Sequence, residues 1–308
     1  MAIFTAKDAE VFLPRQIADG MVKHVRDGST VAKLAAREPM RFGKTDIIVF
    51  NEAPKAEFVE AGAKKSATDI ELTAVTATPK KAQVTMRFDQ EVQWASEDYQ
   101  LGILSELASE GQLALSRALD LGVYHRINPL TGEEISSWNN YLTATNKNVE
   151  LSKTVDADAV IREAVGLIMN DAKAAPVTGI ALDPKLSWAL ASLTGKTANG
   201  QSDGVQRYPN LGFGADVTDF LGLRAAQSNT VSGVPEAADT GVRGIVGDFD
   251  NGIRWGVQRE LPVEIIQFGD PDGQGDLKRQ NQIALRLEIV YGWHVFADRF
   301  AVIKKAAE

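Results

Sequence analysis

The chain has 308 residues, a formal net charge of −8 at pH 7 and no cysteine, and 44% of its residues are hydrophobic. This content is enough for one large domain or two, and the missing cysteines exclude disulfides, thiol nucleophiles and zinc-finger-like sites. The acidic balance argues against a dedicated nucleic-acid binder. Because the sequence has no apolar run of about 18 residues and no signal peptide at residues 1–8, we expect a soluble protein made in a cytoplasm, without membrane contact.

The N-terminal region predicts a short helix followed by a long β-hairpin. Residues 14–27 carry apolar side chains at helical spacing and stop at a glycine. Residues 69–78 and 81–92 alternate apolar and polar side chains with a period of two, which predicts two strands, and Pro79 between them fits an edge position or a bend. The apolar face of the second strand includes Val84, Met86 and Phe88. About twelve residues of strand span roughly 40 Å, about twice the usual length, so we expect this face to pack against a neighbouring subunit.

Residues 96–122 predict one long amphipathic helix directly after the hairpin. Ser96 is a favourable N-cap, and leucine and alanine recur at helical spacing along one face. The helix would be about 26 residues and roughly 40 Å long. Gly102 and Gly111 lie inside it, and we interpret them as tolerated interior glycines rather than as sites of close packing.

The rest of the chain predicts an α+β fold. A second amphipathic helix begins at Asp156 or Asp158, and a short helix follows Asp183. The Asp-Asn-Gly sequence at residues 250–252 is a turn signal, and whether it closes a two-residue hairpin stays open. Strands are predicted at residues 178–182, 242–247, 252–258, 261–268 and 282–296, of which the last two are expected to pair as a second long hairpin. Polar loops are predicted at residues 125–155 and 194–210.

The sequence offers no catalytic constellation. His24, His125 and His294 are far apart, and none is part of an HxxxH or HExxH arrangement. There is no phosphate-binding GxxxxGK[ST] loop and no GxSxG nucleophile elbow. We therefore expect no enzyme activity and no cofactor, and we interpret the three histidines as structural or solvated.

One acidic loop has oxygen ligands at calcium-loop spacing. Asp270, Asp272 and Asp276 are followed by Asn281 at the twelfth position, where a calcium loop has a bidentate glutamate. Position five is glutamine, and strands rather than helices flank the loop. The interpretation that we favour is a polar hairpin tip, with calcium binding as the alternative.

Short sequence strings in a fixed order resemble one known family, the major capsid proteins of tailed bacteriophages with the Hong Kong 97-type shell fold. The likeness covers nearly the whole chain, and it is the order and spacing of the strings that is specific. The matching strings are residues 13–17 and 29–34 for the N-terminal arm, 59–62, 66–69 and 78–81 for the extended loop, 89–91 and 119–122 for the spine helix, and 247–249, 259–263, 284–286 and 300–301 for the C-terminal half.

The resemblance implies a domain organisation. It implies an N-terminal arm at residues 1–45, an extended loop at 46–92, a peripheral domain at 93–149 and 256–296, and an axial domain at 150–255 and 297–308. It also implies that the acidic loop at residues 270–276 lies near a contact between capsomers. Lys64 and Lys65, in the polar tip at residues 60–66, fall where some members carry a cross-linking lysine, but no acceptor Asn or Glu matches, so we interpret them as solvated contacts.

The function implied is a structural one. The chain would self-assemble into the pentamers and hexamers of an icosahedral head, with portal and scaffold proteins as partners and non-specific contact with packaged double-stranded DNA. Assembly would take place in the host bacterial cytoplasm, and the product would be the virion. Two alternatives stay open: an encapsulin-type compartment shell built on the same fold, and a soluble α+β enzyme.

Overall fold

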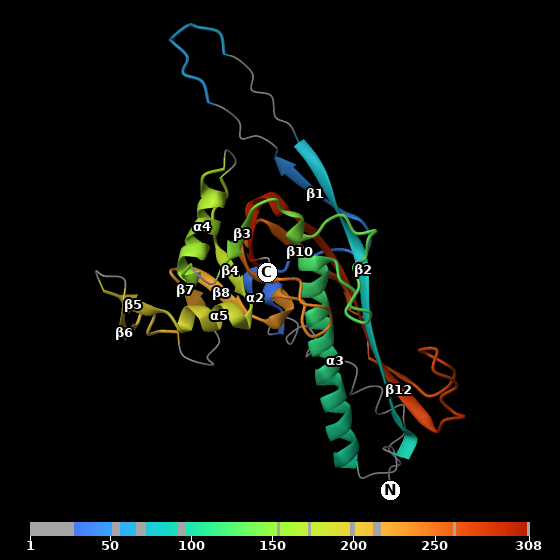
Figure 1. The fold of residues 1–308 in the computed structure, drawn as a ribbon. Helices are drawn as coiled ribbons and strands as arrows, with labels where there is room; N and C mark the ends of the chain where they lie inside the picture. The colour runs from blue at the N-terminus through green and yellow to red at the C-terminus, as the bar shows by residue number, and fades with distance from the viewer. Residues whose placement is uncertain are drawn as a thin grey trace.

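The computed structural model describes residues 28–50, 56–65, 72–91, 97–152, 155–171, 174–197, 201–211, 217–260 and 263–306. Two sheets and one long helix make up most of the molecule, and a slender arm extends away from them (Figure 1). The helix predicted at residues 14–27, with His24, and the N-cap predicted at Ser96 lie outside the described residues.

The first sheet has five strands and forms the long, extended half of the molecule. Its order is β1-β2-β12-β10, and β11 pairs with β12 beside β10, all in antiparallel fashion. The strands are β1 (Thr45–Phe50), β2 (Leu72–Asp89), β10 (Ile253–Glu260), β11 (Glu264–Ile266) and β12 (Gln282–Val295). β2 is the longest strand, and its pairing with β12 runs from Thr78 to Asp89, which gives the sheet its length.

The predicted pairing of residues 69–78 with 81–92 is wrong, whereas the edge position expected as one alternative for Pro79 is confirmed. β2 runs through this proline as one strand, and the true hairpin joins β1 to β2 through residues 51–71. The proline is tolerated because β1 pairs only as far as Ala77, so β2 has a strand on one side only at the next residues. A missing backbone N–H costs little where no strand faces it.

The second predicted long hairpin is also corrected. β12 was predicted at residues 282–296 and is confirmed, but its long partners are β2 and β10. β11 is only three residues long, and it pairs with β12 so that Glu264 lies opposite Arg286. The strand before it therefore contributes a short edge segment instead of a full arm.

Helix α3 (Glu97–His125) confirms the predicted long helix and ends one turn later than expected. It packs on the face of the sheet formed by β2 and β12 (Figure 1). Gly111 marks close packing, contrary to our interpretation, because a Cβ built at this position would lie 2.9 Å from Leu287 Cδ1 and 3.2 Å from Met86 Cε. A hydrogen at this position is what allows the helix to approach β12.

We expect Gly111→Val to lower the free energy of unfolding of the unassembled subunit by about 1–3 kcal/mol, because the added methyl groups overpack this contact. Gly166→Val is the matched control, since Gly166 is also helical and its nearest neighbour to an added Cβ is Asn170 Nδ2 at 3.8 Å. Denaturant titration of both variants measures the difference. Equal stabilities would contradict the close packing of α3 on the sheet.

The second sheet has six strands of mixed direction in the order β3-β13-β9-β4-β8-β7. Alternate residues of its central strands face two different clusters, with Ile180 and Leu182 on one side and Ala181 on the other, as expected for strands buried on both faces. The strands are β3 (Asn148–Leu151), β4 (Gly179–Leu182), β7 (Asp219–Phe220), β8 (Leu223–Gln227), β9 (Val242–Gly247) and β13 (Phe300–Lys305).

Three helices cover this sheet. α4 (Ala157–Met169) and α5 (Pro184–Ala191) pack on one face, as predicted from their apolar stripes, and the short α2 (Thr30–Leu34) contacts β4 and β8. The predicted short helix after Asp183 is confirmed, and Asp183 caps it, since its side chain accepts a hydrogen bond from Lys185 N at 2.9 Å. The single-turn 3₁₀ helices are η2 (Leu142–Ala144), η3 (Asn229–Val231) and η4 (Ala297–Arg299).

Both predicted polar loops contain strands, since β3 lies within residues 125–155, and the open question about the turn at residues 250–252 is answered. The stretch at residues 194–210 contains a two-stranded hairpin, β5 (Thr194–Lys196) with β6 (Ser202–Gln206), where an exposed loop was expected. The turn at residues 250–252 does not close a hairpin, because β9 belongs to the six-stranded sheet and β10 to the five-stranded one. The chain therefore crosses from one sheet to the other at this turn.

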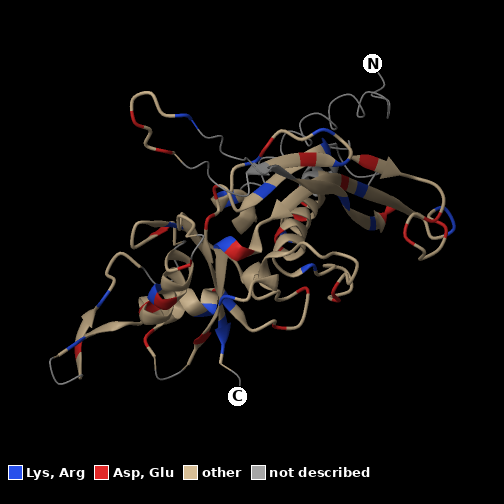
Figure 2. Cartoon of the chain, turned by 90° about the horizontal axis from the view of Figure 1, so that it is seen from above, with Lys and Arg blue, Asp and Glu red and all other residues tan. Residues whose placement is uncertain are grey.

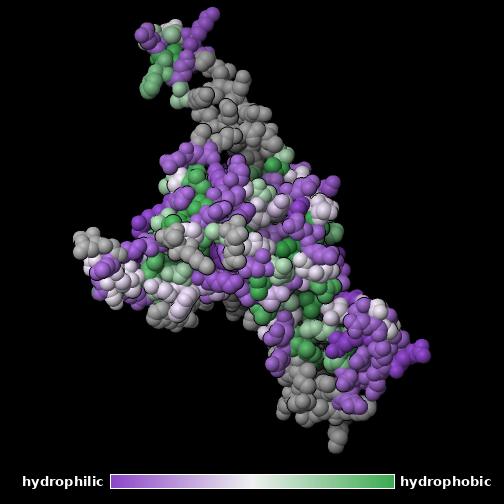
Figure 3. Space-filling model, in the orientation of Figure 1, coloured by the Kyte–Doolittle hydropathy of each residue, from purple (hydrophilic) through white to green (hydrophobic). Residues whose placement is uncertain are grey.

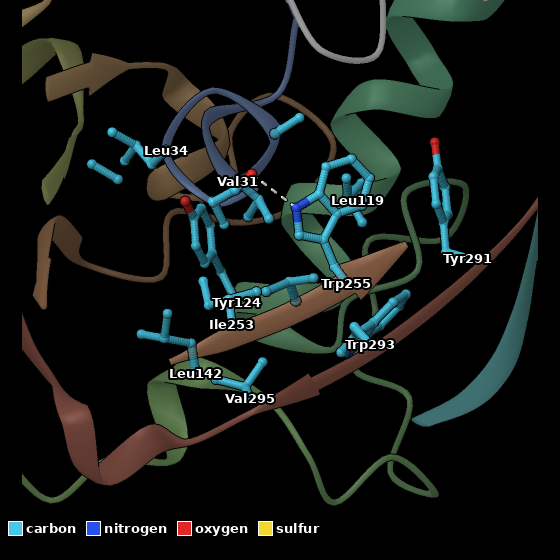
Figure 4. Close-up of a cluster of buried hydrophobic side chains, with 14 of the residues drawn as sticks. Val31, Leu34, Leu119, Tyr124, Leu142, Ile253, Trp255, Tyr291, Trp293 and Val295 are labelled. Carbon is cyan, nitrogen blue, oxygen red and sulfur yellow. Dashed lines mark hydrogen bonds between the residues drawn. The ribbon is translucent and has the colours of Figure 1, made fainter. Parts of the chain in front are cut away.

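The main core joins the two halves of the molecule. Trp255 of β10 lies among Leu119 and Tyr124 of α3 and Tyr291 and Trp293 of β12 (Figure 4). The Trp255 indole is 1% exposed and donates from Nε1 to Ala35 O at 3.1 Å, so the segment after α2 is fixed to the same core. Among the described residues, each helix is too short or too polar to cross a bilayer.

Candidate assembly surfaces

The arm formed by β1 and β2 carries an exposed aromatic side chain at its tip. The tip residues 56–65 lie well away from the two sheets (Figure 1). Phe58 is fully exposed and Val59 is 38% exposed, which produces the hydrophobic surface at the end of the arm in Figure 3. Lys64 and Lys65 are exposed beside them. The sequence prediction identified the lysines but missed the Phe-Val pair directly before the polar stretch, which is the signal for an apolar contact.

The apolar face of β2 packs on this chain's own core. Val84, Met86 and Phe88 are half-buried and contact the main cluster beneath α3 and β12. The premise that this strand cannot bury its apolar face within its own chain is therefore wrong, because β12 and α3 supply the cover that the sequence pattern does not reveal. The opposite face is polar and includes the ion pair between Lys81 and Glu288 at 2.6 Å.

The acidic loop between β11 and β12 is organised around a cation from β2. Arg87 donates from Nε to Asp272 Oδ2 at 2.7 Å and from Nη2 to Asp270 Oδ1 at 3.1 Å, and it also donates to Gly275 O and Gln280 Oε1, both at 2.9 Å. These contacts hold the pKa of the Asp272 carboxyl below its usual range and raise the pKa of the Arg87 guanidinium. The side chain of Arg87 is only 10% exposed. The result is a compact, charged tip (Figure 2).

The three carboxylates of this loop do not converge on one point where a cation could bind. Asp270 and Asp272 bind the guanidinium, whereas Asp276 accepts a hydrogen bond from Arg279 N at 3.0 Å. Within the described ranges, no three His, Asp or Glu residues are grouped so that they could hold a metal ion. The arrangement therefore favours the interpretation of the loop as a polar hairpin tip.

A buried carboxylate that sequence reasoning missed connects three distant segments. Asp120 of α3 is fully buried, and its Oδ2 accepts hydrogen bonds from Thr30 N at 3.0 Å, Thr30 Oγ1 at 2.7 Å and Thr230 Oγ1 at 2.7 Å. Its Oδ1 accepts from Val31 N at 3.1 Å and from the hydroxyl of Ser29. Asp120 thus ties the segment at residues 29–31 and the loop at η3 to the long helix.

Two histidines and one lysine have shifted pKa values, and each shift has a structural cause. Burial lowers the pKa of His125 to about 4, and its Nε2 lies 2.9 Å from Val231 O. Burial also lowers the pKa of His294, as does the nearby charge of Lys80. Burial lowers the pKa of Lys80 to about 8, while the ring of Trp293, with its centroid 4.1 Å from Nζ, favours the ammonium form.

Comparison with known proteins identifies the family. The phage capsid family matches residues 9–305 of the chain. The chain belongs to the phage capsid family. Its fold matches a solved structure from Mycobacterium phage Ogopogo with a TM-score of 0.78 and 40% sequence identity, over 91% of this chain and 92% of that chain. A structure from Gordonia phage Cozz matches with a TM-score of 0.77 and 30% identity, over 91% of this chain and 87% of that chain.

A more distant structure shares the fold alone. It is described as the capsid of a native GTA particle computed with C5 symmetry, and it matches with a TM-score of 0.55 and 15% identity over 90% of both chains. No curated protein matches the sequence. Family membership makes the chain a structural capsid protein and a virion component, and confirms the prediction that it is not an enzyme. It also confirms the α+β capsid fold.

Proposed function

We propose that this capsid protein assembles into the pentamers and hexamers of an icosahedral head that encloses double-stranded DNA. The observation that carries the proposal is the arm of β1 and β2, whose tip presents Phe58 to solvent far from the chain's own core. An exposed aromatic side chain on a projecting arm is costly in a monomer and useful in an interface. The arm lies across a neighbouring copy, and burial of Phe58 there stabilises the shell.

The proposal divides the chain into the parts expected from its sequence. The N-terminal arm takes residues 1–45 and the extended loop 46–92. The peripheral domain takes 93–149 with 256–296, and the axial domain 150–255 with 297–308. The two sheets support this division, since α3 and β12 lie in the peripheral part and β4, β9 and β13 in the axial part.

Further partners complete the proposal. Scaffold and portal proteins take part in assembly in the host bacterial cytoplasm, and packaged DNA contacts the inner wall without sequence specificity. The net charge of −8 supports weak contact, because an acidic wall repels phosphate and does not hinder filling or release. Lys64 and Lys65 at the arm tip and Asp270, Asp272 and Asp276 at the loop before β12 contribute solvated contacts between copies.

Electron microscopy of particles from expression of the chain tests the proposal. Closed shells with five-fold vertices are the expected result. A chain that stays monomeric or dimeric under all assembly conditions would refute it, and shells that hold a cargo protein instead of a genome would indicate a compartment.

Phe58→Ser is expected to raise the concentration needed for shell assembly by at least about tenfold, since burial of a phenylalanine is worth about 1.5–3 kcal/mol per contact. The free energy of unfolding of the subunit should change by less than about 0.5 kcal/mol, because Phe58 is fully exposed. Light scattering against concentration and denaturant titration measure the two quantities. Leu130→Ser is the control, since Leu130 is 93% exposed on the loop after α3. Assembly of Phe58→Ser at the wild-type concentration would contradict the contact.

A further inference from the structure

The turn between β7 and β8 combines backbone strain with an exposed apolar side chain. Phe220 pairs with Leu223, so the turn consists of two residues, Leu221 and Gly222. Their φ values are 52° and 80°. Both lie in the left-handed region, which a two-residue type I′ hairpin turn requires at both of its central positions. Asn-Gly and Asp-Gly are the preferred sequences for such a turn, because asparagine and aspartate tolerate a positive φ at its first position. A leucine at that position has a strained backbone. The side chain of Leu221 is nevertheless 57% exposed.

The other two non-glycine residues with positive φ in the described ranges have local reasons for it. Arg126 follows the end of α3, where its N–H donates to Gly122 O at 3.2 Å and the next N–H to Leu121 O, as at many helix ends. Asn281 is a residue type that tolerates this conformation. Leu221 has neither a helix end to close nor a tolerant side chain. Its own chain covers less than half of this leucine.

The turn is held on a stiff platform. The Phe220 ring packs edge-on against the Tyr208 ring with centroids 5.1 Å apart, and the Tyr208 hydroxyl donates to Asp158 Oδ2 at 2.9 Å. Arg207 lies 3.1 Å from Asp158 Oδ1, and Asp158 is only 2% exposed. These contacts tie the turn and the base of the β5–β6 hairpin to the start of α4. Val205, 65% exposed on β6, is a second apolar side chain that the same platform presents to solvent.

We propose that Leu221 is a contact residue between copies of this chain, retained at a strained turn position because its side chain is buried against a second copy in the shell. The inference rests on the proposed function. A second copy is the occupant because a two-residue turn with one exposed leucine is far smaller than the roughly 1,000 Å² that a separate stable partner needs. Such a patch contributes only as part of a larger contact that is repeated in every subunit. β7 is two residues long, so partner recognition at this edge relies on side chains and not on strand addition.

Leu221→Asn tests the proposal because its two expected effects have opposite signs. Asparagine relieves the backbone strain, so the melting temperature of the unassembled subunit should rise by about 1–3 °C. The apolar contact is lost, so the concentration needed for shell assembly should rise by at least about fivefold. Thermal unfolding and light scattering against concentration measure the two effects. Leu221→Met is the control, because it keeps an apolar side chain at the same strained position and should assemble within about twofold of the wild type.

Each other outcome overturns the inference in a recognisable way. Leu221→Asn shells that form at the wild-type concentration would show that the side chain makes no contact in the shell, while the proposed function would stand. A lower melting temperature would show that leucine suits this turn, and the argument from strain would fail. A wild-type chain that forms no shells would overturn the proposed function and the inference with it.

Discussion

Asp120→Ala is expected to lower the free energy of unfolding of the unassembled subunit by about 3–5 kcal/mol. The substitution removes the acceptor of five hydrogen bonds. It leaves the Ser29 hydroxyl and the backbone N–H groups of Thr30 and Val31 without an acceptor. The hydroxyls of Thr30 and Thr230 keep their hydrogen bonds to Tyr124 and Ser228. Each orphaned buried donor costs about 1–3 kcal/mol before the structure relaxes. Relaxation should take the form of detachment of α2, because four hydrogen bonds from its N-terminus end on this carboxylate.

Denaturant titration and limited proteolysis together measure this effect. We expect cleavage near residues 28–34 to become fast in Asp120→Ala and to stay slow in Asp89→Ala, a matched control at an exposed aspartate at the end of β2. Asp120→Asn should lie between the two, since an amide keeps one acceptor oxygen. If Asp120→Ala were as stable as the control, the carboxylate would not connect the arm to α3.

The importance of Asp120 could not be predicted from the sequence. Its donors lie about 90 residues before it and 110 residues after it, and no periodicity links such distant positions. An aspartate in the middle of a helix is by default a solvated residue. The one local signal in the sequence is that Asp120 stands between two leucines, Leu119 and Leu121. Both leucines are fully buried in the structure.

Elements with a strong local pattern were predicted well. α3, α4 and β12 appear within a few residues of their expected bounds, because their patterns extend over many residues. The arm was predicted in outline but with its turn in the wrong place, since Pro79 has the sequence signature of a bend. Whether a proline interrupts a strand depends on the neighbouring strand, and the end of β1 at Ala77 is not visible in the pattern of β2 itself.

The candidate assembly surfaces show the same limit. Alternation along β2 correctly predicted one apolar face, but the sequence could not say which segment covers it. Met86 lies opposite Leu285 of β12, about 200 residues later in the chain. The exposed residues that the structure offers for assembly, Phe58 and Leu221, are single side chains in a tip and a turn, where no periodicity applies.

The stability of the subunit is expected to fall by up to about 3 kcal/mol as the pH drops from 6.5 to 4, and His125 is the cause. Burial lowers the pKa of His125 to about 4 in the folded chain, against 6.5 in an exposed histidine. Between these values the unfolded chain binds a proton that the folded chain does not, so unfolding becomes more favourable as the pH falls. The difference of about 2.5 pKa units corresponds to about 3 kcal/mol at 1.36 kcal/mol per unit.

The variant His125→Gln separates the contribution of this histidine to the pH dependence of stability from the contribution of the carboxylates. Glutamine does not titrate and its amide can still donate to Val231 O, so the free energy of unfolding should be nearly flat between pH 6.5 and 4 relative to the wild type. His294→Gln is the control, because His294 is half-buried and the slope that it contributes should be smaller. A wild-type slope that persisted in His125→Gln would mean that other groups carry it.

Below pH 4 the wild-type chain and the His125→Gln chain should lose stability in parallel, because carboxylates with lowered pKa values, such as Asp272 beside Arg87, then take up protons. Between pH 6.5 and 4, the resistance of the subunit to acid is therefore set by His125, which joins the end of α3 to Val231 of η3.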